Sequence, residues 1–197
     1  MKNRDFIKEK RQIRVFISSS FEDMDNERNY LRDEIFPRIQ GKARKRAVAV
    51  TALDLRWGIP DGTDLGQTIE ICMNEIDNSF PFFIGIIGGR YGTQPDKAKV
   101  FDSNDILREQ FSILSQYFEK KLSITEMEMR YGVLDCDEEE RRKINALFLT
   151  RKADLGAINK DVRLNALNND IHACGEQFDE GKISIDEKNH IWTSDYL

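Results

Sequence analysis

One short run of apolar residues limits the folds open to this chain more than any other feature. The run PFFIGII occupies residues 81–87 and is followed by Gly88 and Gly89. Its apolar residues do not alternate with polar ones, so it does not suit a strand with one face in water. A strand covered on both faces is typical of a parallel sheet with crossover helices on either side. The run therefore predicts an α/β domain.

The rest of the chain alternates between strand and helix patterns. Short β-branched or apolar runs predict strands at 13–17, 47–55 and 146–149, with short candidates at 183–185 and 191–193. Apolar residues at helical spacing predict helices that begin at an Asp23 cap, over 69–76, over 107–118, near Ser123 and after an Asp161 cap. Residues 60–66 and 96–102 are expected to be loops. We expect an N-terminal extension over 1–12 and a single domain over 13–197.

Charge disfavours one class of partner. The chain has 197 residues, of which 33% are charged, and its net charge is −5. A globally basic nucleic-acid binder is therefore not expected. The basic run 42–46 is predicted to be a solvated helix end, so we expect no direct nucleic-acid partner.

Cysteine use and hydropathy indicate the compartment. The three cysteines contain no CxxC pair, and together with the two histidines they lack zinc spacing. No apolar run reaches the roughly 18 residues that a membrane helix needs, and the charged N-terminus is unlike a signal peptide. We expect a reduced, cytoplasmic protein with no metal and no membrane contact.

The carboxyl ends of the predicted parallel strands are where a ligand is expected to bind. Three loops there contain hydroxyls, glycines, arginines and aromatic rings, which suit phosphates and a stacked base: Ser18, Ser19, Ser20, Phe21, Asp54, Arg56, Trp57, Gly88, Gly89, Arg90 and Tyr91. Neither GxGxxG nor GxxxxGK[ST] occurs, which disfavours a dehydrogenase-type Rossmann site and a P-loop ATPase. Structural alternatives stay open, since Asp54 could simply pair with Arg56 and the glycines could serve a turn.

The predicted helix that begins near Ser123 contains two candidate acids. Ser123 and Glu126 fit the S/T-x-x-E capping box, so Glu126 could merely satisfy the helix N-terminus. Glu128 lies roughly 80° from the centre of the apolar face, where it could point into a crevice beside the sheet. A solvated position is the alternative for Glu128.

Four segments together resemble a known family: RVFISSSFEDMDNERNYLRDEIFP, LDLRWGI, CMNEIDNSFPFFIGIIGGRYG and SITEMEMRYGVL. The resemblance, over about 13–151, is to an N-terminal domain that precedes NACHT-type (STAND) ATPase and repeat modules in nephrocystin-like, telomerase-associated and bacterial defence proteins. That family is similar to TIR domains and to nucleoside deoxyribosyltransferases. The resemblance implies a flavodoxin/TIR-like three-layer sandwich with a mainly parallel five-stranded sheet.

The resemblance also implies a chemistry. In both groups of relatives a glutamate at the start of a helix acts at a sugar C1′, and the deoxyribosyltransferase pattern places a threonine three residues before it, as Thr125 precedes Glu128. The Trp-Cys pair of the TIR pattern is absent, so Glu126 and Glu128 both stay open. The first hypothesis is cleavage of the N-glycosidic bond of NAD or a related nucleotide in immune or antiviral defence signalling, with NAD as substrate and no cofactor.

Under this hypothesis, a carboxylate stabilises an oxocarbenium-like transition state or forms a ribosyl ester. Ser18, Ser19 and Arg90 would hold phosphates, and Trp57 or Tyr91 would stack a base. The alternatives are a non-catalytic oligomerisation or adaptor module that associates with itself or with a NACHT-type ATPase, and a nucleotide sensor without turnover.

Overall fold

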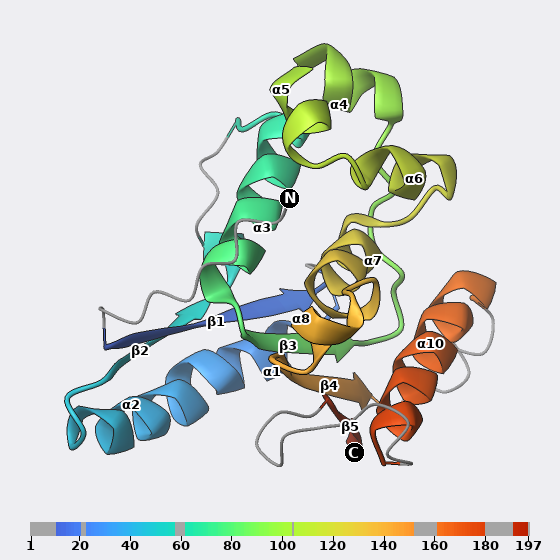
Figure 1. The fold of residues 1–197 in the computed structure, drawn as a ribbon. Coiled ribbons are helices and arrows are strands. Elements are labelled where there is room, and N and C mark those ends of the chain that lie inside the picture. The colour runs from blue at the N-terminus through green and yellow to red at the C-terminus, as the bar shows by residue number, and fades with distance from the viewer. Residues whose placement is uncertain are drawn as a thin grey trace.

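The computed structural model describes residues 11–20, 23–57, 62–103, 105–151, 161–179 and 191–196. Its centre is a parallel sheet with the spatial order β2-β1-β3-β4, and β5 pairs parallel to β4 (Figure 1). The strands are β1 (Gln12–Ser19), β2 (Ala49–Leu53), β3 (Phe82–Ile87), β4 (Asn145–Arg151) and β5 (Ile191–Tyr196). The predicted α/β class and parallel sheet are confirmed. The strand candidate at 183–185 lies outside the described residues.

Helices connect the strands and flank the sheet. They are α1 (Asp25–Tyr30), the π-helix η1 (Leu31–Ile35), α2 (Phe36–Arg44), the short 3-10 helix η2 (Leu55–Trp57), α3 (Leu65–Ser79), α4 (Lys97–Ser103), α5 (Asp105–Gln110), α6 (Leu114–Glu119), α7 (Ile124–Met129), the π-helix η3 (Arg130–Leu134), α8 (Glu138–Arg141) and α10 (Val162–Asp179).

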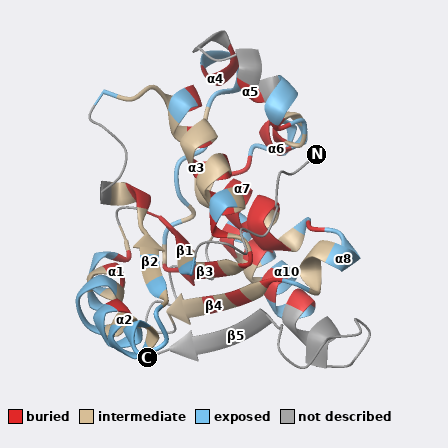
Figure 2. Cartoon of the chain, turned by 60° about the vertical axis from the view of Figure 1, so that its left-hand side comes forward, coloured by how far each residue is buried: buried red, intermediate tan, exposed pale blue. Residues whose placement is uncertain are grey.

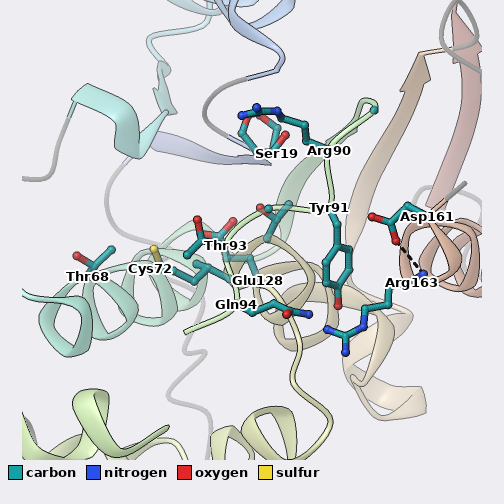
Figure 3. Close-up of a pocket in the computed structure, with 15 residues that line it drawn as sticks. Ser19, Thr68, Cys72, Arg90, Tyr91, Thr93, Gln94, Glu128, Asp161 and Arg163 are labelled. Carbon is teal, nitrogen blue, oxygen red and sulfur yellow. Dashed lines mark hydrogen bonds between the residues drawn. The ribbon is translucent and has the colours of Figure 1, made fainter. Parts of the chain in front are cut away.

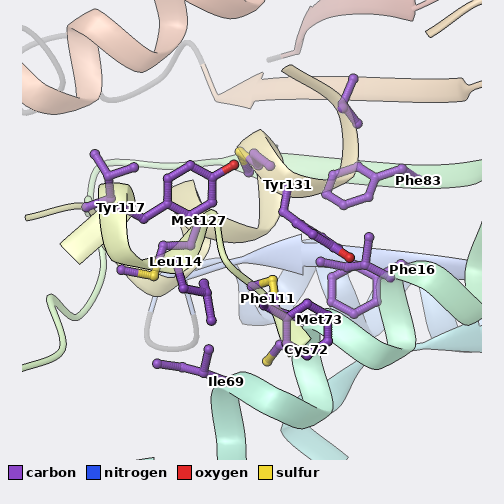
Figure 4. Close-up of a cluster of buried hydrophobic side chains, with 14 of the residues drawn as sticks. Phe16, Ile69, Cys72, Met73, Phe83, Phe111, Leu114, Tyr117, Met127 and Tyr131 are labelled. Carbon is purple, nitrogen blue, oxygen red and sulfur yellow. The ribbon is translucent and has the colours of Figure 1, made fainter. Parts of the chain in front are cut away.

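One face of the sheet is covered by α3, α7, η3 and α10, and its core is aromatic. Phe16 of β1 stacks on Phe83 of β3 with ring centroids 5.6 Å apart (Figure 4). The ring centroid of Phe148 on β4 lies 6.1 Å from that of Phe83. Gly85 permits this packing, because a Cβ there would lie 2.5 Å from the Phe148 ring. The large rings thus fill the space between sheet and helices, which is where buried residues concentrate in Figure 2.

The other face packs on α1, η1 and α2. Alternate residues of the same strands, Ile17 and Ile86, meet Met24 and Phe36 there. The strands are therefore apolar on both faces, which explains why the run at 81–87 does not alternate.

Several predicted local features differ in the structure. The expected loop at 96–102 contains α4, which Asp96 caps by accepting from the Ala98 N–H over 2.9 Å. The single helix expected over 107–118 is two helices, because the chain turns at Phe111, whose buried ring meets Tyr131 edge-on at 5.7 Å. Long-range packing decides this break, and local periodicity does not reveal it.

Of the three helix caps predicted from the sequence, two are confirmed and one is wrong. Asp23 is not a cap: the cap residue of α1 is Met24, without a side-chain hydrogen bond, and the Asp23 carboxylate instead pairs with Arg151. Ser123 does cap α7, accepting from the Glu126 N–H over 3.2 Å. Asp161 accepts from the backbone N–H groups at the start of α10, as expected.

Candidate active site

A pocket opens beside the ends of β1 and β3, where the rule for parallel sheets places ligands (Figure 3). Its volume is about 760 Å³, within the range of small-molecule sites. The lining comes from the end of β1, from α3, from the segment after β3, from α7 and from the start of α10: Ser19, Ser20, Thr68, Cys72, Gly89, Arg90, Tyr91, Gly92, Thr93, Gln94, Ile124, Thr125, Glu128, Asp161 and Arg163.

Glu128 is the buried acid of this pocket. Its exposed fraction is 6%, and the Ser18 Oγ donates a hydrogen bond to its Oε2 over 2.6 Å. Burial raises the pKa of Glu128 to about 7, although hydrogen bonds from Ser18 and Cys72 and the charge of Arg28 act in the opposite direction. Near neutral pH the carboxyl group is therefore available both as a base or nucleophile and as an acid.

Arg28 is the cation that supports this acid, and sequence analysis missed it. Its side chain is 1% exposed and pairs with Asp54 over 2.9 Å, while Nη1 donates to the Ser19 carbonyl over 3.3 Å. Burial lowers the pKa of Arg28, and the charges of Asp54 and Glu128 raise it. A sequence signal existed, because Arg28 follows Met24 by four residues and precedes Leu31 by three, on the apolar face of the helix.

Glu126 has different surroundings from Glu128, although it is also buried. The Tyr91 hydroxyl donates to Oε2, and the Arg130 Nε donates to Oε1 over 2.7 Å. The pKa of Tyr91 is raised to about 12, mainly by burial and secondly by its hydrogen bond to Glu126. Glu126 does not line the pocket, and its carboxylate fastens Tyr91 to the start of α7.

The segment 89–94 forms one wall of the pocket and is held by two backbone hydrogen bonds. Asp23 Oδ2 accepts from the Arg90 N–H over 3.0 Å, and the Thr93 carbonyl accepts from the Ile124 N–H over 2.9 Å. Gly92 has a φ of +97°, a conformation that glycine adopts without strain. This wall therefore follows the start of α7 closely and places Tyr91 beside Arg163, whose guanidinium lies 5.9 Å from the ring centroid (Figure 3).

The structure brings part of the predicted residue set together. The pocket wall includes Ser19, Ser20, Gly89, Arg90, Tyr91, Thr125 and Glu128. Six others do not line it: Ser18, Asp54, Arg56, Gly88, Ser123 and Glu126. Phe21 lies outside the described residues, as does the side chain of Trp57.

Most of the six have a role in support of the wall. Ser18 orients Glu128 through its hydrogen bond. Asp54 accepts from Arg56 as well as from Arg28, so the pairing considered from sequence is present. Gly88 packs so closely on Asp23 that a Cβ would lie 2.0 Å from its Oδ2.

Two helices contribute wall residues that sequence analysis did not select. Thr68 and Cys72 are four residues apart on α3, and Asp161 and Arg163 begin α10. The spacing of Thr68 and Cys72 on one helix face was a usable signal, whereas nothing local marks Arg163. Among the described residues, no group of three or more His, Cys, Asp or Glu side chains could hold a metal ion.

Comparison with known protein families identifies the family of this chain. A family model described as "Domain of unknown function (DUF4062)" matches residues 14–190. The chain belongs to the DUF4062 family. No solved structure matches this chain significantly. Within the described part of this domain, no helix is long and apolar enough to cross a membrane.

Curated relatives of the DUF4062 domain are much longer proteins. Telomerase protein component 1 of Rattus norvegicus is 38% identical over 120 residues, which is 60% of this chain and 4% of that protein. A TPR repeat-containing protein of Dictyostelium discoideum is 30% identical over 138 residues, which is 66% of this chain and 8% of that protein. NACHT domain- and WD repeat-containing protein 1 of Mus musculus is 31% identical over 97 residues, which is 45% of this chain and 6% of that protein. The expected resemblance to telomerase-associated and NACHT-containing proteins is confirmed.

Proposed function

We propose that this domain binds a nucleotide in the pocket and cleaves its N-glycosidic bond, with NAD as the substrate. The observation that carries the proposal is the position of Glu128: a buried carboxylate, oriented by Ser18, on the wall of an open cavity. Cleavage at C1′ of a ribose needs one such group, because the transition state carries positive charge on the sugar.

The chemistry uses the ionised form of Glu128. As the bond from C1′ to the nicotinamide nitrogen breaks, the bonding pair leaves with nicotinamide, which becomes neutral and needs no proton. Glu128 either stabilises the oxocarbenium ion or bonds to C1′ as an ester. Water then attacks C1′, which gives ADP-ribose and releases one proton. With a pKa of about 7, Glu128 can accept that proton.

The cations of the pocket fit a diphosphate. Arg90 and Arg163 are both exposed and belong to different elements that line the pocket. A guanidinium recognises phosphate oxygens through paired N–H donors. A dinucleotide could therefore place its ribose beside Glu128 and its phosphates toward the solvent side.

The fold supports the same proposal by analogy. The strand order β2-β1-β3-β4-β5 is that of flavodoxin-like folds, which bind ligands at the strand ends. A TIR-like relationship would explain both this order and the position of Thr125 and Glu128 at the start of α7. The function is proposed from the side chains of the site, because one fold supports many unrelated functions.

The test is release of nicotinamide from NAD by the purified protein, alone and with a NACHT-type module. We expect release by the unaltered protein and by Glu119→Gln, which changes an exposed acid, and loss of release in Glu128→Gln. The proposal fails if nicotinamide never appears, or if Glu128→Gln releases it at the unaltered rate. If only Glu126→Gln removes activity, the assignment to Glu128 is wrong.

A second function is favoured by the relatives. Because one of them is named for a NACHT domain and WD repeats, we propose as the alternative an adaptor module that associates with itself or with a NACHT-type ATPase in the cytoplasm during defence signalling. The three free cysteines are compatible with a reducing compartment. Co-purification with such an ATPase that is unaffected by Glu128→Gln, without nucleotide cleavage, would support this alternative.

A further inference from the structure

The three serines at the end of β1 have three different environments. Ser18 donates to Glu128, and the Ser19 hydroxyl donates to the Ser20 carbonyl over 3.3 Å. Ser20 is 6% exposed, and its Oγ has no hydrogen-bond partner among the described residues. Yet Ser20 lines the pocket. A buried hydroxyl without a partner is costly, so native proteins retain one only for a reason.

The position of Ser20 relative to Glu128 narrows what could pair with it. Ser20 directly follows β1, which ends at Ser19, and the Cα atoms of residues two apart in any chain lie at most about 7 Å from each other. Ser20 therefore lies close to Ser18, which holds Glu128, and it lines the same pocket as Glu128. A group that bridges Ser20 and the region beside Glu128 has the dimensions of one sugar ring.

The charges of the pocket favour an uncharged ligand group as the partner of Ser20. Ionised Glu128 repels a phosphate placed next to it, and the exposed arginines of the pocket, Arg90 and Arg163, come from the segment after β3 and from α10. A sugar hydroxyl is neutral and both donates and accepts, as does the serine hydroxyl.

We infer that Ser20 is a specificity residue whose hydroxyl binds the 2′-hydroxyl of the reacting ribose, so that the site selects ribonucleotides over 2′-deoxyribonucleotides. This inference rests on the proposed function, because the ribose must present C1′ to Glu128. The 2′-hydroxyl is the hydroxyl nearest to C1′, and it is therefore the one placed between the two protein groups.

The experiment compares nicotinamide mononucleotide with its 2′-deoxy analogue by titration calorimetry, with ligand integrity checked by chromatography. We expect the unaltered protein to bind the ribonucleotide about 10-fold more tightly. Ser20→Ala should bind both compounds equally, at the affinity of the deoxy analogue. Ser112→Ala, an exposed serine outside the pocket, should keep the preference.

Thermal stability gives a second readout, because Ser20→Ala removes an unpaired polar group. The melting temperature without ligand should stay unchanged or rise by about 2–4 °C, which separates lost binding from lost folding. A preference that survives in Ser20→Ala overturns the inference while the proposed function stands. If the unaltered protein binds neither nicotinamide mononucleotide nor NAD, both fail together.

Discussion

The Ser18 hydroxyl donates to the Glu128 carboxylate over 2.6 Å, between residues that are 110 positions apart in the chain. Both side chains are buried, at 1% and 6% exposure. A strand end and the start of a helix are thus joined by a hydrogen bond to a charged group, which is among the stronger kinds in proteins. The bond fixes the direction of the carboxylate before any ligand arrives.

Removal of this bond should change the titration of Glu128. In Ser18→Ala the ionised carboxylate loses a donor, and we expect its pKa to rise by about 1 unit above the present value of about 7. The measurement is the carboxyl titration followed by NMR on glutamate-labelled protein, together with the pH dependence of nicotinamide release. Both should move to higher pH. An unchanged titration would contradict the assigned role of Ser18.

Glu128 should also make the stability depend on pH. Its pKa is raised from 4.5 to about 7, so between these values the folded protein holds a proton that the unfolded chain has lost. The stability that this proton on Glu128 gives to the folded protein is therefore complete below pH 4.5 and is lost as the pH rises through 7. Relative to the unaltered protein, Glu128→Gln should gain about 3 kcal/mol in free energy of unfolding between pH 4 and pH 8.

Urea unfolding at several pH values measures this gain. Glu119→Gln serves as the matched control, because Glu119 is exposed and its ion pair with Lys97 has a long N–O distance of 3.7 Å. The difference in free energy of unfolding between Glu119→Gln and the unaltered protein should stay constant over the same pH range. A constant difference for Glu128→Gln as well would show that Glu128 is not the raised group.

The buried pair of Arg28 and Asp54 should be costly to break. Arg28→Met leaves Asp54 with Arg56 as its remaining cation, and we expect a loss of about 3 kcal/mol in the free energy of unfolding. Arg32→Met, at an exposed pair with Asp33, should have no measurable effect in the same chemical unfolding assay. Equal effects of the two substitutions would contradict the importance of burial.

Two glycines should respond in opposite directions to alanine. Gly85→Ala forces a Cβ against the Phe148 ring at 2.5 Å, so we expect a loss of about 1–3 kcal/mol. Gly41 lies inside α2 with nothing within 4 Å of an added Cβ, so Gly41→Ala should gain about 0.5–1 kcal/mol. Thermal unfolding checks both, and a gain in Gly85→Ala would contradict the packing described for Phe148.

Local patterns were sufficient for the elements whose structure is decided locally. The strand at 81–87, the Ser123 cap and the Asp161 cap follow from short-range hydrophobic pattern and hydroxyl or carboxylate capping. The helix break at Phe111 does not follow from a local pattern, because it depends on the Tyr131 ring from another segment.

The same distinction applies to the site. The sequence placed Glu126 and Glu128 on one helix but left their roles open, since the choice depends on partners elsewhere in the chain. Tyr91 and Arg130 hold Glu126, whereas Ser18 holds Glu128. Arg28 could have been found from its place on an apolar helix face, but its pairing with Asp54 is a tertiary contact.

Asp23 gives the fold a mechanical link between two distant segments. One carboxylate oxygen meets Arg151 at the end of β4 over 3.2 Å, and the other accepts from the Arg90 N–H over 3.0 Å. The end of β4 and the rim of the cavity are therefore connected through a single acidic side chain, in addition to the pairing of β3 with β4.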